Sequence, residues 1–190
     1  MFEFDSEFFN LNQIADSGQC FRWQEIFCDN ESKKYHYQVP VKNKLLNIFQ
    51  DDKKIKIDCT ESEFESFWKN YFDFNTDYKK ITSLIVDDEY LQRAIKYGYG
   101  IRILNQDLWE MIISFIISQN NNIPRIKKSI EGLCKIFSKT QITSELKSFP
   151  TAQEIISFGD KNKILEKLKS VGLGYRDEYI YLIWPGSSVG

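Results

Sequence analysis

The sequence predicts an α+β fold in which an antiparallel sheet comes first and a group of helices follows. Short β-rich stretches alternate with Asp/Asn/Lys-rich connectors as far as residue 58, and from residue 61 apolar side chains recur at helical spacing. Composition agrees, because 42% of the 190 residues are hydrophobic and 15% are aromatic, which suits one or two folded domains.

The N-terminal part is expected to form a twisted antiparallel sheet. A short opening segment around residues 11–15 precedes four strand-like stretches, and the polar connectors between them favour a meander. The expected strands are residues 20–27, 35–41, 45–49 and 55–58.

Strands give way to helices near residue 61. Thr60 and Glu63 have the spacing of a capping box, which predicts a helix start followed by a buried aromatic stripe. One or two further helices are expected between residues 77 and 97, where the glycines Gly98 and Gly100 end them.

The second half is predicted to be helical. Residues 106–118 are apolar nearly all round, which is typical of a fully buried helix that anchors a domain. Pro124 suits the first turn of a helix over 125–137, and Thr151 with Glu154 predicts another over 152–158. The apolar pattern continues to Val-Gly-Leu-Gly, and residues 175–183 look like the start of one more helix.

We expect two domains and a tail: residues 1–97, 98–183 and 184–190. The tail breaks the last helix without supplying an element that covers its apolar face. This favours a helical domain that is cut short, and the alternative is a natural disordered end.

Composition also limits the class of protein. Residues 1–97 carry 13 Lys/Arg and 18 Asp/Glu, whereas residues 98–190 carry 12 and 9, so the second half is the expected contact face if DNA is the partner. Four cysteines without a CxxC pair and one histidine support neither a zinc site nor an iron–sulfur cluster. The acidic N-terminus and short apolar runs indicate no signal peptide and no membrane span, so we expect a cytoplasmic protein.

Three strings could carry function. In Gly18-Gln-Cys-Phe-Arg-Trp23, a glycine before a strand would let the backbone approach a ligand, although a turn glycine feeding an aromatic core strand is the plainer interpretation. In Ser118-Gln-Asn-Asn-Asn-Ile-Pro-Arg125, three amides suit a left-handed turn and could bond base edges, or they could form a polar helix connector. In Leu173-Gly-Tyr-Arg176, an aromatic side chain and a guanidinium follow a helix-ending glycine, and a packed cap is the alternative.

Taken together, the strings resemble the 8-oxoguanine DNA glycosylase family in order and spacing. The matching text is GQCFRW, then GIRILNQDLWEMIISFIISQNNNIPRIKKSIEGLC, then FP followed by LKSVGLGYRDEYI, within residues 1–183. The resemblance implies an N-terminal α+β domain with a twisted antiparallel sheet, then a helical domain of the helix-hairpin-helix glycosylase superfamily. It implies recognition of 8-oxoguanine opposite cytosine in double-stranded DNA, with base flipping, by a glycosylase and AP lyase that needs no metal or cofactor.

The resemblance also implies roles for five residues. Gly18 corresponds to the glycine whose carbonyl accepts a hydrogen bond that 8-oxoguanine donates and guanine cannot. Asn120 corresponds to the asparagine that occupies the space of the flipped base. Arg125 and Arg176 correspond to the arginines that read the orphaned cytosine, and Tyr175 to the wedge that buckles the neighbouring stack.

The family's DNA-gripping hairpin, nucleophilic lysine and assisting aspartate have no counterpart up to Ile183. We therefore expect an incomplete helical domain, no catalytic residue in this chain, and no activity of the chain alone. Two alternatives stay open: a non-catalytic DNA- or protein-binding module built on the same scaffold, and a split enzyme completed by a separate polypeptide that carries the hairpin. We expect a monomer in a bacterial cytoplasm, nucleoid-associated when bound to DNA.

Overall fold

A computed structural model describes residues 1–85 and 88–183 of the chain. The chain divides into two compact units: an N-terminal unit, Met1–Val39 with Leu46–Asn105, and a helical unit, Pro40–Leu45 with the residues from Gln106 onward. The domain limits expected at residues 97 and 183 stay predictions. The expected tail, residues 184–190, lies outside the described residues.

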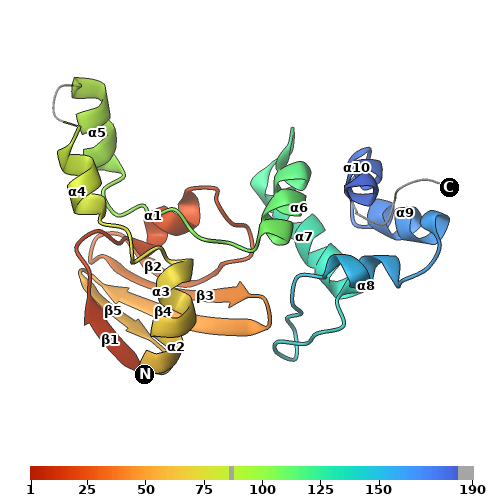
Figure 1. The fold of residues 1–190 in the computed structure, drawn as a ribbon, viewed down its shortest axis with the longest axis horizontal. Coiled ribbons are helices and arrows are strands. Elements are labelled where there is room, and N and C mark those ends of the chain that lie inside the picture. Colours follow the sequence, from red (N-terminus) through yellow and green to blue (C-terminus); the bar gives the residue numbers. More distant parts are fainter. Residues whose placement is uncertain (86–87, 184–190) are drawn as a thin grey trace. The chain divides into compact units, whose positions relative to one another are not determined.

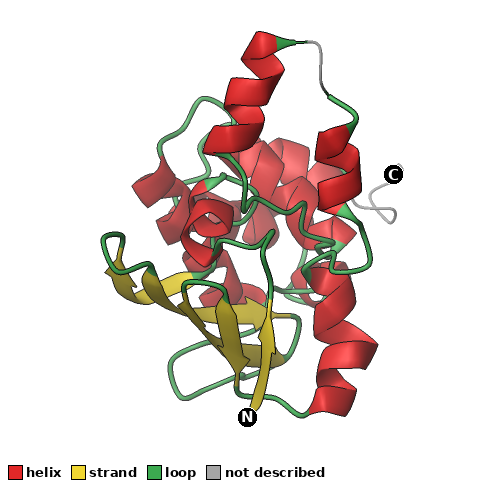
Figure 2. Cartoon of the chain, turned by 90° about the vertical axis from the view of Figure 1, so that its left-hand side faces the viewer, coloured by secondary structure: helices red, strands yellow, loops and turns green. Residues whose placement is uncertain are grey.

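The predicted α+β class is confirmed by a five-stranded antiparallel sheet in the order β1-β5-β4-β3-β2, which Figure 2 shows as one continuous layer. Neighbours in sequence pair from β2 to β5, so the expected meander is present. The strands are β1 (Phe2–Asp5), β2 (Gln24–Asp29), β3 (Lys34–Val41), β4 (Lys44–Asp51) and β5 (Lys54–Ile57).

Two details of the sheet differ from the sequence prediction. Strand β1 was not predicted, yet it pairs with β5, with Phe2 opposite Ile57 and Phe4 opposite Ile55. The strand expected at residues 20–27 begins only at Gln24, because residues 18–23 form an irregular, partly buried segment instead.

One face of the sheet is covered by a helical segment made of α2 (Glu61–Glu63), a π-helical turn η1 (Phe64–Trp68) and α3 (Lys69–Tyr71), as Figure 1 shows. The segment begins where predicted, because the Thr60 side chain accepts a hydrogen bond from the Glu63 N–H. Phe64 packs against Phe2 and Phe4, with ring centroids 5.1 and 4.8 Å away. The aromatic stripe therefore forms the core between helix and sheet.

Two short helices, α4 (Tyr78–Ser83) and α5 (Glu89–Tyr97), follow in the N-terminal unit, and α5 ends at Gly98 as expected. The chain then returns through Arg102, whose guanidinium lies over the rings of Phe74 and Tyr78 and donates to the Phe8 and Asp73 carbonyls. Burial lowers the pKa of Arg102, which the nearby Tyr78 and Asp73 partly oppose. Arg102 therefore anchors the end of this unit.

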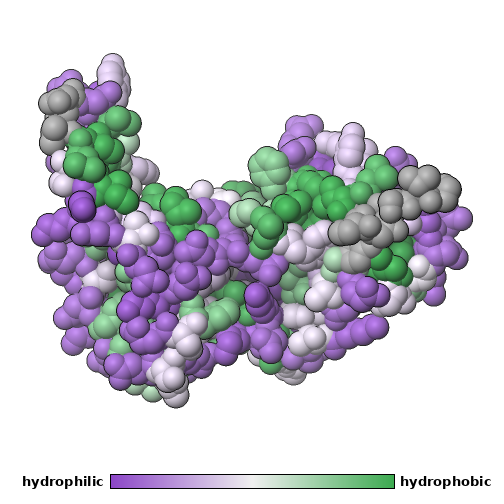
Figure 3. All heavy atoms as spheres, in the orientation of Figure 1, coloured by the Kyte–Doolittle hydropathy of each residue, from purple (hydrophilic) through white to green (hydrophobic). Residues whose placement is uncertain are grey.

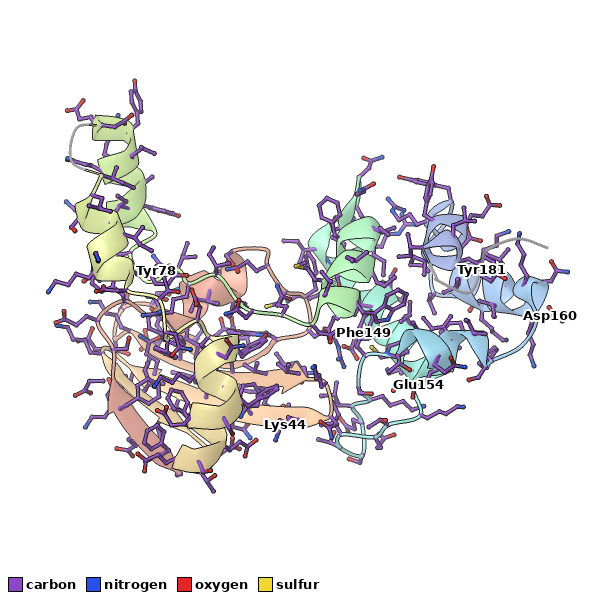
Figure 4. All side chains as sticks on the ribbon, viewed as in Figure 1. Lys44, Tyr78, Phe149, Glu154, Asp160 and Tyr181 are labelled. Atoms are coloured by element: carbon purple, nitrogen blue, oxygen red, sulfur yellow. The ribbon has the colours of Figure 1, made fainter. Side chains whose placement is uncertain are left out.

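The helical unit contains α6 (Leu108–Ser118), α7 (Ile123–Phe137), α8 (Ala152–Ile156), α9 (Lys161–Ser170) and α10 (Arg176–Leu182). Side chains cap several of these helices, and the Thr151–Glu154 capping box is formed as predicted. Figure 4 shows Glu154 and Asp160 at the starts of α8 and α9. The core of the unit is the apolar face of α7: Ile126, Ile130, Leu133, Cys134 and Phe137.

The expectation that the helix over 106–118 is fully buried is wrong for the described structure. Ile113 and Ile117 are buried, whereas Leu108 and Phe115 are each 64% exposed. Helix α6 contacts α7 and α10, and Met111 and Ile112 also stay partly exposed, at 42% and 38%. Figure 3 shows this surface as a patch over α6 and α10. Within the described ranges, we find no helix long and apolar enough to cross a bilayer.

Candidate nucleic-acid interface

Gly18 lies in a turn directly after α1 (Leu11–Asp16) in the N-terminal unit. Its φ is +77°, in the left-handed region that favours glycine, and a Cβ placed there would meet no atom within 4 Å. The residue is exposed, so nothing described in the unit blocks the approach of a ligand to this stretch of backbone. The turn therefore suits recognition by a main-chain atom.

The residues after Gly18 are held by the unit's interior. The Gln19 amide donates to the Arg102 carbonyl at 2.8 Å and accepts from the Leu104 N–H at 2.8 Å. Trp23 is 5% exposed, and its ring N–H donates to the Tyr71 hydroxyl at 3.0 Å. The sequence did not predict this role of Gln19, because its hydrogen-bond partners lie more than eighty residues away and no local pattern indicates them.

The side chains of the three consecutive asparagines between α6 and α7 differ in their hydrogen bonding. The Asn121 side-chain amide donates to the Ile117 carbonyl at 3.0 Å and closes α6. The Asn122 side-chain oxygen accepts from the Arg125 N–H at 3.0 Å and caps α7. Asn120 has φ +47°, is exposed, and its side chain has no hydrogen-bond partner among residues 1–85 and 88–183. Asn120 is therefore the amide that remains available for a ligand.

Arg125 lies in the first turn of α7 and is exposed. Its guanidinium donates one long hydrogen bond, 3.3 Å, to the Gly172 carbonyl of the turn before α10. Most of its donors therefore remain free for a carbonyl, a ring nitrogen or a phosphate.

Arg176 is only 5% exposed, in contrast to Arg125. Its guanidinium donates to the carbonyls of Gln119, Asn120 and Leu173, and its carbon lies 4.6 Å from the centre of the Tyr175 ring. Three bonded carbonyls satisfy most of its five N–H groups, so in this structure Arg176 fastens the asparagine turn to the start of α10.

Tyr175 stands beside this cluster with 58% of its surface exposed, and its ring meets that of Tyr179 edge-on at 6.1 Å. An exposed aromatic ring next to free amide and guanidinium groups suits stacking on, or wedging between, nucleic-acid bases. Of the five predicted residues, the structure brings together Asn120, Arg125, Tyr175 and Arg176 in the helical unit. Gly18 belongs to the other unit.

No group of three or more His, Cys, Asp or Glu side chains that could hold a metal occurs in the described ranges, and all four cysteines are free thiols. Every lysine in those ranges is exposed or half-buried. An amine that acts as a nucleophile near neutral pH needs a desolvated or strongly charged pocket, and these lysines lack a desolvated one.

Comparison with known proteins identifies relatives of both units. The family of the 8-oxoguanine DNA glycosylase N-terminal domain matches residues 1–112. The N-glycosylase/DNA lyase of Saccharomyces cerevisiae is 29% identical over 184 residues, which cover 90% of this chain and 47% of the relative.

Solved structures are also similar. One is MBOgg1 in complex with a low-affinity DNA ligand, with a TM-score of 0.79, 33% identity, and coverage of 95% of this chain and 64% of that chain. Another is the Clostridium acetobutylicum 8-oxoguanine glycosylase/lyase in complex with double-stranded DNA containing cytosine opposite 8-oxoguanine, with a TM-score of 0.78, 29% identity, and coverage of 95% and 62%. The chain thus spans about half the length of the curated relative and less than two thirds of these solved chains.

Proposed function

Starting from the fact that this chain belongs to the 8-oxoguanine DNA glycosylase family, we propose that it recognises 8-oxoguanine opposite cytosine in duplex DNA. The observation that carries the proposal is the cluster in the helical unit, where Asn120 offers an uncommitted amide between two arginines and an exposed tyrosine. Such a set matches the needs of a gap left by a flipped base and of the orphaned base opposite it.

In the helical unit, the Asn120 amide fills the space of the extruded purine, and Arg125 donates to the acceptor edge of the cytosine. Tyr175 enters the neighbouring base step as a wedge. Arg176 holds the Gln119–Asn120 backbone and has a remaining N–H for the same cytosine. The exposure of Asn120 supports this arrangement, because its amide has no hydrogen-bond partner among the described residues.

In the N-terminal unit, the Gly18 carbonyl senses the lesion. 8-Oxoguanine carries a hydrogen on the imidazole-ring nitrogen that is a bare acceptor in guanine, so a carbonyl at that position attracts the damaged base and repels the normal one. The open space beside Gly18 supports this role, because the base edge has to come within hydrogen-bonding distance of the backbone.

The relatives are named glycosylase/lyases, and we assign to this chain the recognition part of that activity, with excision of the oxidised base and cleavage at the abasic site requiring an amine that the described residues do not supply. The residues described here contribute recognition. The described lysines are too well hydrated to supply the amine of a covalent intermediate.

The proposal is tested by fluorescence anisotropy with matched duplexes that carry 8-oxoguanine or guanine opposite cytosine. A lesion reader binds the 8-oxoguanine duplex more tightly, and the preference falls when Asn120→Gly removes the amide. Equal affinity of the wild-type chain for both duplexes would contradict the proposal and would favour a generic DNA-binding module on the same scaffold.

A further inference from the structure

A groove of about 580 Å³ runs along one face of α7 in the helical unit. Arg125, Lys128, Gly132 and Lys135 recur there at three- and four-residue spacing, which places them in one row of the helix. The opposite wall is the turn at residues 170–172, between α9 and α10. Arg125, the proposed reader of the cytosine, therefore stands at one end of the row.

Two glycines, Gly132 and Gly172, lie in the walls of the groove. A Cβ on Gly132 would lie 2.9 Å from a methyl carbon of Val171, so α7 and the turn pack backbone against side chain at this point. Gly172 has φ +82°, which a residue with a side chain rarely adopts. The wall of the groove thus depends on two positions that tolerate only glycine well.

The groove is basic. Arg125, Lys128 and Lys135 line it against one carboxylate, Glu131. Neither Lys128 nor Lys135 has an ion-pair or hydrogen-bond partner for its side chain within the described part of the chain, and both are exposed. An unpaired row of cations beside a groove attracts an anion.

Ser129 is a second, independent sign of a ligand. It lines the groove and is only 2% exposed, yet its hydroxyl has no hydrogen-bond partner among the residues that the structure describes. A helical serine usually donates to a carbonyl one turn back, as Ser66 does to Ser62. An acceptor in the groove would give this hydroxyl the hydrogen-bond partner that the described residues do not supply.

On the basis of the proposed function, we propose that this groove binds a backbone phosphate of the DNA strand that carries the cytosine. Lys128 and Lys135 supply the charge, and the Ser129 hydroxyl donates to a phosphate oxygen. Contacts to phosphates position a protein on the duplex and carry no sequence information, so the groove adds affinity without adding lesion preference.

The test compares Lys128→Gln and the double variant with Lys135→Gln against Lys127→Gln, a charge-matched control on the same helix that does not line the groove. Affinity is measured for damaged and undamaged duplexes across a salt series. Each lost phosphate contact lowers the salt slope by about 0.9, so a fourfold rise in salt weakens Lys128→Gln about 3.5-fold less than the wild type. Ser129→Ala is expected to weaken both duplexes equally.

The proposed phosphate site is refuted if Lys128→Gln and Lys127→Gln have the same salt slope of DNA affinity. It is also refuted if Lys128→Gln changes the ratio of the affinities for damaged and undamaged duplexes. A wild-type chain without lesion preference whose slope still falls in Lys128→Gln would retain the groove and refute the proposed function. A chain that binds neither duplex would refute both. Millimolar inorganic phosphate, at ionic strength matched with chloride, should leave DNA binding unchanged, whereas displacement that Lys128→Gln abolishes would show a small-anion site instead.

Discussion

The asparagine turn allows recognition and stability to be separated by two neighbouring substitutions. Asn122→Ala removes the oxygen that accepts from the Arg125 N–H and caps α7. Loss of such a cap costs about 1 kcal/mol. In a chain of this length, that free energy lowers the melting temperature by roughly 2 to 4 °C.

Asn120→Gly removes an amide that has no partner in the described structure, while glycine accepts the left-handed backbone. Alanine would be a poorer choice, because left-handed backbone costs it about 1 to 2 kcal/mol. We expect the stability of Asn120→Gly to stay within about 0.5 kcal/mol of the wild type. Loss of the Asn120 contacts in the gap left by the flipped base should cost about 1 to 3 kcal/mol, as for a specific contact to a base, or roughly 5- to 150-fold in affinity for the 8-oxoguanine duplex.

The assay pairs thermal unfolding, followed by circular dichroism at a helical wavelength, with anisotropy on the two duplexes. Asn122→Ala should lower the melting temperature and keep the ratio of the affinities for the two duplexes. Asn120→Gly should keep the melting temperature and lower that ratio. The reasoning is refuted if Asn120→Gly melts as early as Asn122→Ala, because the Asn120 amide would then be part of the fold rather than of the ligand site.

Four further predictions follow from named contacts. Arg176→Lys keeps the charge but loses the planar guanidinium that binds three carbonyls, so we expect the free energy of unfolding to fall by about 2 kcal/mol and amide hydrogen exchange in the asparagine turn to become faster. Unchanged protection from exchange would contradict the role of Arg176 in holding this turn. Gly18→Ala meets no neighbour, so backbone strain alone should cost about 1 kcal/mol in a melting experiment, and a larger loss would indicate a contact not seen here. Burial raises the pKa of Glu154, but hydrogen bonds from the Lys139 and Thr151 N–H groups outweigh burial and hold that pKa below its usual range. The ionised Glu154 therefore stabilises the fold above the pKa of the unfolded chain, and this contribution is lost as pH falls through the pKa of the folded chain. In Glu154→Gln, the free energy of unfolding should fall less steeply as the pH is lowered. Borohydride trapping on an abasic duplex should give no covalent adduct with this chain, and an adduct mapped by mass spectrometry would identify a lysine that becomes buried on DNA.

Local signals predicted the helices well. Thr60, Thr151 and the proline after Ile123 act within one turn of their own helix, so their spacing alone indicates where each helix begins. The meander was predictable for the same reason, since polar connectors lie directly between alternating strands.

Features that depend on distant partners were not predictable. Strand β1 exists because Phe2 and Phe4 pair with β5 and pack on Phe64, more than fifty residues away. Residues 20–23 were expected to begin a strand, yet they lie outside the ladder, and the side chain of Gln19, directly before them, bonds to the backbone of Arg102 and Leu104. The apolar composition of α6 indicated burial, but exposure depends on which elements pack against it, and composition does not contain that information.

The candidate site likewise combines features that local sequence predicts with features that depend on contacts between distant residues. Sequence alone could not show which of the three adjacent asparagines is available to a ligand, because all three have the same donors and acceptors. The structure ranks them by what each already binds: Asn121 closes one helix, Asn122 opens the next, and Asn120 binds nothing described. The ranking depends on Arg176, which fixes the backbone of Asn120 by its carbonyl and leaves the amide free. If that is correct, Arg176→Lys should reduce lesion preference through the turn, and combining it with Asn120→Gly should cost less than the sum of the two, whereas strict additivity would mean that the residues act independently.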